Sequence, residues 1–382
     1  MRAALLRNFG DLVVEEVPDP APRPGEVVVD VAGVQPSVTE CALIAGEPVA
    51  LHDRLAAALA AGPVRFGGHE FCGTVRETGR DVAGWRPGDR VTAVETVTCG
   101  ACGACRRGRS DACTRPEFIG FTRPGAFAEQ VVVPAMSLVR VPDAVSVAAA
   151  TAIQPLAGAV HAHAEARIRP GESVLVIGAG VMGLLAVQVA RHGGAGQVLV
   201  AGRSPAKLTL ADRFGADRTY GSDVDVAAAV RDGTDGVGVD VVVETAGGPP
   251  SAGLAGADTL DLAARCVRRG GRIVMVSVLP ARVEAPLGLL RERSVSLLHP
   301  RSGAGGYSPS ASAFEYALRL VARGDVDVEA LITHQLTGID ALPAAVAMTA
   351  GKAAHGAINP VQVLLNRSGT ATTPAGDPRA DA

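Results

Sequence analysis

Residues 174–183 read Val-Leu-Val-Ile-Gly-Ala-Gly-Val-Met-Gly, an apolar run that leads directly into the pattern Gly-x-Gly-x-x-Gly. In this pattern the glycines permit a tight turn, let the backbone approach a pyrophosphate and seat a helix on a sheet, while the helix N-terminus offers N–H donors. The stretch therefore predicts a buried strand, a phosphate-binding turn and a helix; a Gly-rich turn without a nucleotide is the alternative. The residues expected to bind a dinucleotide are Gly178, Gly180, Val181, Met182 and Gly183.

The end of the next expected strand, residues 197–200, bears on which dinucleotide binds. An NAD site places a carboxylate at this point, on the ribose 2′-hydroxyl. Here residues 200–204 read Val-Ala-Gly-Arg-Ser, without an acid. Glycine leaves room for a 2′-phosphate, and cationic and hydroxyl side chains can bind it. We therefore expect NADP(H) rather than NAD(H), although Arg203 as a solvated loop residue is the alternative. The expected contacts are Gly202, Arg203, Ser204 and Lys207.

Two patterns divide the rest of the chain. Before residue 146, short β-type runs alternate with turn residues, which is typical of an irregular, mostly antiparallel β domain. Between residues 146 and 300, strands alternate with Ala-rich helical stretches, which predicts an α/β domain with a doubly wound parallel sheet. Residues 301–365 are expected to rejoin the first domain, and residues 366–382 have the composition of a disordered tail. Within 301–365 we expect alternating helices and strands at 308–323, 330–335, 341–350 and 359–365.

Composition excludes several classes of protein. The chain has 382 residues, enough for two domains, with 36 Lys+Arg against 39 Asp+Glu and a net charge of -3. There is no basic surplus for a nucleic acid or an anionic membrane, so we expect neither of them as a partner. The N-terminus lacks the apolar core of a signal peptide, which predicts a cytoplasmic protein.

Four of the seven cysteines are separated by two, two and seven residues. Such spacing lets four thiolates surround one tetrahedral Zn²⁺ with no open position, which is a structural site. Disulfide pairing and an iron–sulfur cluster are the alternatives, but a reducing compartment disfavours the first and no electron-transfer feature supports the second. The predicted ligands of one zinc per chain, in a lobe at about residues 95–115, are Cys99, Cys102, Cys105 and Cys113.

Further landmarks follow in a set order: Gly68-His-Glu70, Val82-Ala-Gly-Trp-Arg-Pro-Gly-Asp-Arg-Val91, Gly125-Ala-Phe-Ala-Glu129 and Gln154-Pro-Leu156. With the motifs above, they resemble the zinc-type medium-chain dehydrogenase/reductase family, which includes alcohol, sorbitol, threonine and glucose dehydrogenases. The resemblance covers about residues 1–365. It implies a GroES-like catalytic domain over 1–145, a Rossmann domain over 146–300, hydride transfer to or from a nicotinamide, and a homodimer or homotetramer.

The sequence departs from the family's pattern where a catalytic zinc binds. The family's Gly-(Ile/Val)-Cys-Gly segment supplies a thiolate, but residues 33–35 read Gly-Val-Gln. The glutamate that sorbitol-dehydrogenase-like members carry before Pro-Leu is Gln154 here. Of the usual ligands only His69 and Glu70 remain, and a carboxamide oxygen is a poor substitute for a thiolate, so a second, catalytic zinc is doubtful. Three nearby residues could compensate, although a buried thiol is the ordinary interpretation of both cysteines among them: Glu40, Cys41 and Cys72.

The same residues define the expected reaction centre. The resemblance assigns to Ser37 the hydroxyl that relays a proton from the substrate, beside His69 and Glu70. Gln35 and Gln154 could donate hydrogen bonds to a developing oxyanion. We expect NADP(H)-dependent hydride transfer at an alcohol or carbonyl carbon of a small or specialised metabolite. The alternatives are zinc-independent reduction of a conjugated C=C or C=N bond, and an NADP(H)-binding protein without catalysis.

Overall fold

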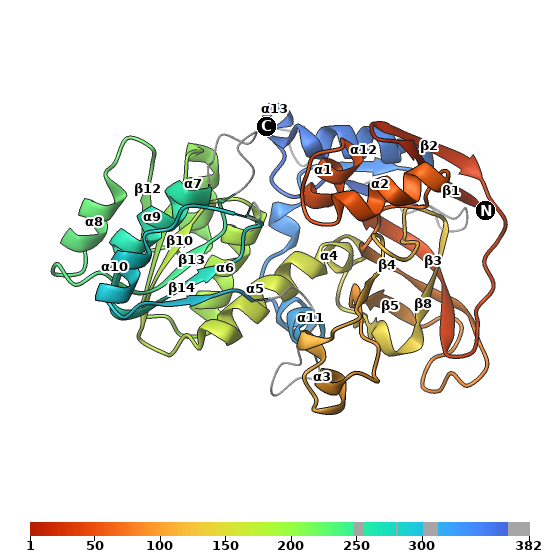
Figure 1. Cartoon of the computed structure of the whole chain (residues 1–382), viewed down its shortest axis with the longest axis horizontal. Coiled ribbons are helices and arrows are strands. Elements are labelled where there is room, and N and C mark those ends of the chain that lie inside the picture. The colour runs from red at the N-terminus through yellow and green to blue at the C-terminus, as the bar shows by residue number, and fades with distance from the viewer. Residues whose placement is uncertain (248–255, 280–281, 301–311, 366–382) are drawn as a thin grey trace, which may run out of the picture.

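The computed structural model describes residues 1–247, 256–279, 282–300 and 312–365. The predicted disordered tail and the first residues of the helix expected at 308–323 lie outside these ranges. The described chain forms two domains joined by helices, with the parallel-sheet domain on the left of Figure 1 and the β-rich domain on the right.

Six parallel strands form the sheet of the first of these domains, in the order β12-β11-β10-β13-β14-β15. Their bounds are Ser173–Ile177 for β10, Gln197–Ala201 for β11, Arg218–Tyr220 for β12, Val239–Glu244 for β13, Val267–Met275 for β14 and Ser296–Leu298 for β15. The order reverses between β10 and β13, and doubly wound sheets bind their ligands at the carboxyl ends of the strands beside such a point. This sheet confirms the predicted Rossmann architecture, and the motif at residues 174–183 lies at the reversal.

Helices cover both faces of the parallel sheet, which explains why its strands are apolar throughout. Along β10, Val174 and Val176 enter one buried cluster, whereas Leu175 and Ile177 enter another. The first cluster also contains residues of α5, α6 and α11, and the second contains residues of α8, α9 and α10. The helices of this domain are α5 Ile153–Ala166, α6 Val181–His192, α7 Pro205–Arg213, α8 Val226–Asp232, α9 Gly256–Cys266, α10 Leu287–Glu292 and α11 Ala313–Arg323.

The β-rich domain is built on a seven-stranded sheet in the order β16-β17-β3-β4-β5-β9, with β8 also paired to β3. All neighbours are antiparallel except β16 and β17. The strands are β3 Glu26–Gln35, β4 Glu70–Thr78, β5 Arg90–Ala93, β8 Gln130–Pro134, β9 Leu138–Arg140, β16 Gln335–Thr337 and β17 Gln362–Leu364. A hairpin of β1 (Arg2–Asn8) and β2 (Asp11–Glu16) forms a separate sheet. Because β17 pairs with β3, the C-terminal segment rejoins the N-terminal domain.

Several short helices belong to this domain. They are α1 Val38–Ile44, α2 His52–Ala61, α4 Val147–Thr151, α12 Leu342–Ala350 and α13 Lys352–His355. One local prediction was wrong: the strand expected at 330–335 is a 3₁₀ turn at Glu329–Leu331, and β16 begins only at Gln335. The turn forms because Asp327 accepts a hydrogen bond from the backbone N–H of Ala330 (2.9 Å), which directs Leu331 into the core.

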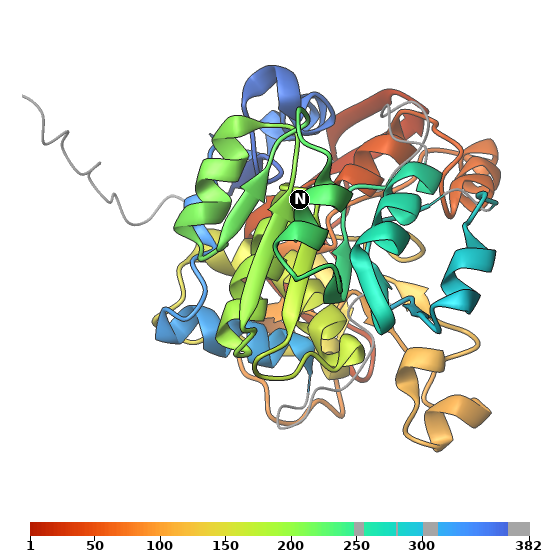
Figure 2. The same ribbon diagram turned by 90° about the vertical axis from the view of Figure 1, so that its left-hand side faces the viewer.

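The cysteine-rich segment forms a small lobe that projects from the β-rich domain. It contains β6 Thr96–Val97, α3 Gly103–Arg106, a 3₁₀ turn at Ser110–Ala112 and β7 Glu117–Phe118. The lobe extends away from both sheets, at the bottom of Figure 1 and at the lower right of Figure 2. Across the described ranges, no helix has both the length and the apolar character needed to cross a membrane.

Candidate active site

The turn after β10 has the shape that a dinucleotide pyrophosphate requires. Gly178 has φ +106°, and a Cβ on Gly183 would lie 1.8 Å from the Gly178 carbonyl oxygen, so neither position tolerates a side chain. A Cβ on Gly180 would meet nothing within 4 Å, so the space beside this residue is open. α6 begins at Val181 without a side-chain cap, which leaves its first N–H groups directed at that space. These features fit a bound pyrophosphate.

The end of β11 lacks a carboxylate, as its sequence indicated. Packing inside the protein also explains why residue 202 is a glycine. A Cβ at this position would lie 2.9 Å from the Cβ of Ala179, so the glycine is required by packing whether or not a phosphate binds. Arg203 is exposed, Lys207 is half-buried, and Ser204 precedes α7 without using its hydroxyl as a cap. Their role in binding a 2′-phosphate remains a prediction.

The four cysteines of the lobe form a compact cluster. Their sulfur atoms all lie within 4.8 Å of one another, and all four are free thiols. The Sγ–Sγ distance is 3.4 Å between Cys102 and Cys105 and 3.6 Å between Cys99 and Cys113. Tetrahedral zinc with Zn–S bonds of about 2.3 Å requires S–S separations of about 3.8 Å, so the cluster fits a structural zinc. Backbone N–H groups of Cys105 and Thr114 lower the pKa of the Cys102 thiol to about 5, which favours the ligating thiolate.

His69 is held at the start of β4 by close backbone packing. A Cβ on Gly68 would lie 2.3 Å from the backbone nitrogen of Phe127, so only glycine allows the chain to pass at this point. The ring of Phe121 packs on the imidazole with centroids 4.9 Å apart. Aromatic and backbone atoms therefore bury His69 on one side. The partners of its two ring nitrogens determine how the ring is oriented.

Glu40 determines one of those nitrogens. It is fully buried on α1, where its carboxylate accepts hydrogen bonds from Nδ1 of His69 (2.8 Å) and from the backbone N–H of Gly68 (2.7 Å). Its other oxygen accepts from the backbone N–H of Ser37 (2.8 Å), and the Ser37 hydroxyl accepts from the backbone N–H of Glu40 (3.1 Å), which is a capping box. Glu40 is therefore an orienting group for His69 rather than the substitute metal ligand considered above. The signal for its position was the Ser-x-x-Glu spacing at residues 37–40.

Glu70 and Gln35 form a second pair at the end of β3. The Gln35 side chain donates from Nε2 to the Glu70 carboxylate (2.5 Å). Its Oε1 accepts hydrogen bonds from Asn359 (2.7 Å) and from Gln362 (3.0 Å), both in the C-terminal segment. Both polar atoms of the carboxamide thus have protein partners. Sequence reasoning missed Asn359 and Gln362, because only the pairing of β17 with β3 places them beside Gln35.

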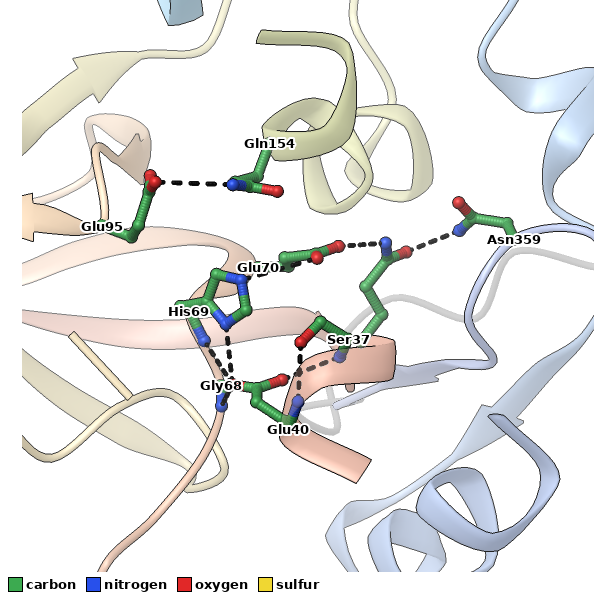
Figure 3. A network of polar contacts seen from close by, with 9 residues as sticks. Ser37, Glu40, Gly68, His69, Glu70, Glu95, Gln154 and Asn359 are labelled. Atoms are coloured by element: carbon green, nitrogen blue, oxygen red, sulfur yellow. Dashed lines mark hydrogen bonds and ion pairs between the residues drawn. The ribbon is translucent and has the colours of Figure 1, made fainter. Parts of the chain in front are cut away.

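Figure 3 shows how the two pairs meet. His69 lies between Glu40 and Glu70, and its Nε2 is 3.6 Å from Oε1 of Glu70. On the far side of Glu70, Gln154 from α5 donates to the carboxylate of Glu95 at 3.4 Å. The structure therefore brings together the predicted residues of the centre and adds Glu40 and Glu95 to them.

The electrostatics of the centre follow from buried carboxylates around one imidazole. Burial lowers the pKa of His69, but the charges of Glu40 and Glu70 outweigh it and raise that pKa to about 9. Burial raises the pKa of Glu70 to about 7, against the opposing effects of His69 and of the Gln35 hydrogen bond. Burial also raises the pKa of Glu40, but His69 and the backbone N–H donors bring it below its usual value. The imidazolium form of His69 is thus favoured at neutral pH, with Nδ1 bonded to a carboxylate.

The donors of this centre do not fit a conventional catalytic zinc. Such a site needs three protein ligands with atoms directed at one point. Of the candidates, Gln35 has both carboxamide atoms engaged, and Gln154 donates to Glu95. Only His69 Nε2 and one oxygen of Glu70 face each other, and within the described ranges the lobe is the sole cluster of three or more His, Cys, Asp or Glu ligand atoms.

The two nearby cysteines do not supply the missing ligands. Cys41 is buried and its thiol donates to the carbonyl of Val346 at 3.5 Å, and burial raises its pKa to about 12. Cys72 is buried on β4, and burial raises its pKa to about 11. Both therefore behave as ordinary buried thiols.

Comparisons with known proteins agree with this architecture. Residues 23–143 match the alcohol dehydrogenase GroES-like domain, and residues 181–323 match the zinc-binding dehydrogenase domain. Sorbitol dehydrogenase of Bacillus subtilis (strain 168) is 30% identical over 342 residues, which cover 88% of this chain and 90% of that protein. The chain belongs to the zinc-type medium-chain dehydrogenase/reductase family. L-threonine 3-dehydrogenase of Pyrococcus horikoshii is 32% identical over 326 residues, which cover 85% of this chain and 88% of that protein.

Solved structures of other medium-chain dehydrogenases superpose on nearly the whole chain. A zinc-binding dehydrogenase from Sinorhizobium meliloti 1021, bound to NADP, has 31% identity and a TM-score of 0.80, with 95% of this chain and 98% of that chain covered. An alcohol dehydrogenase from Thermus sp. ATN1 has 28% identity and a TM-score of 0.81, with 96% and 100% covered. This medium-chain dehydrogenase/reductase is therefore an oxidoreductase of the alcohol dehydrogenase type.

Proposed function

We propose that this protein is an NADP(H)-dependent oxidoreductase that transfers hydride at an alcohol or carbonyl carbon of a small or specialised metabolite, from a reaction centre without a catalytic zinc. Two hydrogen bonds support the proposal: the one between His69 and Glu40, and the one from Gln35 to Glu70. Glu40 fixes Nδ1 of the imidazole, which leaves Nε2 as its reactive nitrogen. Gln35 closes the position from which a thiolate would bind zinc.

The cofactor preference rests on the end of β11 and on one relative. Arg203, Ser204 and Lys207 follow the end of β11, where an NAD site carries an acid. The related Sinorhizobium meliloti dehydrogenase, 31% identical, is bound to NADP. When bound, NADPH would supply the hydride that reduces the substrate, or its oxidised form would accept one.

The residues of the centre can provide the proton that accompanies hydride. As a carbonyl carbon accepts hydride, its oxygen becomes an alkoxide that needs a hydrogen-bond donor and then a proton. We assign that proton to Nε2 of His69, with the Glu40 carboxylate stabilising the imidazolium and holding the ring. Ser37, whose hydroxyl oxygen accepts from Glu40 N–H, keeps its own proton for a second hydrogen bond to the substrate oxygen. In alcohol oxidation the same groups remove the proton.

A second candidate function is reduction of a C=N or conjugated C=C bond. Glu40, Glu70 and Glu95 are all buried in the centre, and they surround a single imidazole. Such an excess of buried carboxylates would stabilise a cationic iminium substrate. Reduction of a conjugated C=C bond also requires few hydrogen-bond donors, because the negative charge left by hydride addition delocalises over the conjugated system.

Turnover of NADPH with a panel of ketones, aldehydes, enals and cyclic imines tests these alternatives. Consumption with aldehydes or ketones, lost in a His69→Gln variant, is the expected result. Consumption with imines or enals alone would instead favour the second candidate. Tight NADPH binding with no turnover of any class would indicate a binding protein without catalysis. Light scattering on the same sample would test the expected homodimer or homotetramer.

A further inference from the structure

The end of β13 is bonded to the dinucleotide-binding turn at the point where the order of the strands reverses. β10 and β13 are neighbours in the sheet (Figure 1), and Ile177 at the end of β10 pairs with Glu244 at the end of β13. The next residue, Thr245, reaches back across this junction, because its backbone N–H donates to the Ile177 carbonyl at 2.9 Å. The two halves of the parallel sheet are therefore joined directly beside the turn.

The hydroxyl of Thr245 contacts the turn itself. Its Oγ1 is 2.9 Å from the carbonyl oxygen of Ile177 and 3.2 Å from that of Gly178, so its single proton is shared between the two carbonyls. A Cβ on Gly178 would lie 2.7 Å from this Oγ1, and a Cβ on Gly183 would lie 3.0 Å from it. The hydroxyl thus occupies the space that the absent side chains of two motif glycines leave open.

A buried carboxylate fixes the chain on either side of Thr245. Glu244 is fully buried, and one of its oxygens accepts hydrogen bonds from the backbone N–H groups of Ala246 (2.7 Å) and Gly247 (2.5 Å). Its other oxygen accepts a hydrogen bond from the hydroxyl of Ser277, which follows β14. Because the residues before and after Thr245 are held in this way, its hydroxyl stays directed at the turn.

The turn needs such a partner, because its glycines allow many backbone conformations. The Gly178 carbonyl that Thr245 contacts also lies against Gly183 in the first turn of α6, where a Cβ would be 1.8 Å from its oxygen. A hydrogen bond to this carbonyl therefore determines how the turn leads into α6, whose first N–H groups face the pyrophosphate site. Fixing the turn before the ligand arrives reduces the ordering that binding must supply.

We propose that Thr245 is a positioning residue for the cofactor, which holds the glycine turn in its phosphate-binding conformation before the dinucleotide binds. The role is carried by the side-chain hydroxyl, and Glu244 keeps that hydroxyl in place. This inference rests on dinucleotide binding in the proposed function, and it applies to NADPH and NADH alike, because both contain the pyrophosphate.

Affinities for the two dinucleotides test the assignment. Thr245→Val keeps the shape of the side chain and removes the hydroxyl, so it should weaken NADPH and NADH binding by the same factor, about threefold to tenfold, the usual loss for a neutral hydrogen bond. Calorimetry on the cofactor-free protein measures both constants. Thr245→Ser retains the hydroxyl and should recover most of the loss. 2′-AMP, which contains no pyrophosphate, should bind Thr245→Val and wild type equally.

Thr234→Val is the matched control, in the segment that precedes β13. Thr234 is half-buried like Thr245, and its hydroxyl is likewise close to two backbone carbonyls, those of Val230 (2.7 Å) and Arg231 (3.4 Å). Urea unfolding should show comparable losses of stability in the two variants, whereas Thr234→Val should keep the wild-type affinity for both dinucleotides. In steady-state kinetics, Thr245→Val should raise the KM for NADPH and leave kcat within about twofold, as expected when an interaction common to ground state and transition state is lost.

Three outcomes would overturn the positioning role. Unchanged affinity of Thr245→Val for both dinucleotides would remove Thr245 from cofactor binding and leave the proposed function intact. A loss confined to NADPH would place the effect at the 2′-phosphate instead of the turn. Equal losses of affinity in Thr234→Val would make the effect one of domain stability. If wild type binds NADH as tightly as NADPH, the cofactor preference in the proposed function fails, while equal losses in Thr245→Val would still support the role of Thr245.

Discussion

The cysteine lobe and the reaction centre are both places where a member of this family can bind metal, and their donor atoms are arranged in opposite ways. In the lobe, four sulfur atoms lie within 4.8 Å of one another and their nearest polar neighbours are backbone N–H groups. In the reaction centre, each candidate donor is bonded to another side chain, as His69 is to Glu40 and Gln35 is to Glu70. The comparison shows that a metal site needs donor atoms that are free of other side chains and directed at one point. When the same residue types are hydrogen-bonded to one another, the network is suited to proton transfer instead.

The largest expected effect is loss of the lobe's zinc. Cys99→Ser removes one of four ligands from a closed site, and we expect zinc binding to be lost and the free energy of unfolding to fall by roughly 3 kcal/mol or more. Elemental analysis and urea unfolding measure the two quantities. Cys41→Ser, which changes a buried thiol outside the lobe, is the control and should retain the zinc. If Cys99→Ser keeps its zinc, the lobe is not the site.

The next largest effect concerns the proton donor. His69→Gln should lower kcat by about 10² to 10⁴, the range for loss of a general acid. Glu40→Gln should lower it by about tenfold to a hundredfold, since it disturbs the orientation of a ring that remains present. Steady-state kinetics measure both, with Glu77→Gln, which changes an exposed carboxylate on β4, as control. Equal activity of Glu40→Gln and wild type would contradict the positioning role.

A third prediction tries to turn the reaction centre into a metal site. Gln35→Cys combined with Gln154→Glu supplies two anionic ligands beside His69, and we expect this double variant to bind about one zinc more than wild type. Gln35→Cys alone offers one new thiolate beside His69 and Glu70, and it should bind the additional zinc more weakly than the double variant, which supplies a fourth donor. Elemental analysis of the three proteins decides between these results. A second zinc held as tightly in the single variant as in the double variant would mean that the wild-type centre lies closer to a metal site than its hydrogen bonds indicate.

Predictions from the sequence agree best with the structure where the residues of a site are close together in the chain. The Gly-x-Gly-x-x-Gly turn and the spacing of two, two and seven between cysteines could be interpreted from sequence, because neighbouring residues form each site. The reaction centre could be only partly predicted. Its residues come from the ends of separate strands and helices, and Asn359 meets Gln35 across 324 residues of chain. The role of Glu40 was missed for the same reason, since its partner His69 lies 29 residues away.

The smallest expected effect is on the pH dependence of stability. The pKa of His69 is about 9 in the folded protein, above its ordinary value of 6.5, because Glu40 outweighs the effect of burial. Folding is therefore stabilised by His69 below pH 6.5, and this contribution is lost as the pH rises toward 9. The difference in free energy of unfolding between wild type and His69→Gln should thus shrink between pH 6.5 and 9.5. A constant difference across that range would argue against the charged pair with Glu40.

Zinc per chain in the active wild-type enzyme tests the central claim most directly. Elemental analysis should give a value near one, and that zinc should be absent from Cys99→Ser while NADPH-dependent turnover in wild type survives removal of loosely bound metal. A value near two, with activity proportional to the second zinc, would contradict the account. The reaction centre would then use a metal despite the hydrogen bonds that engage its donors.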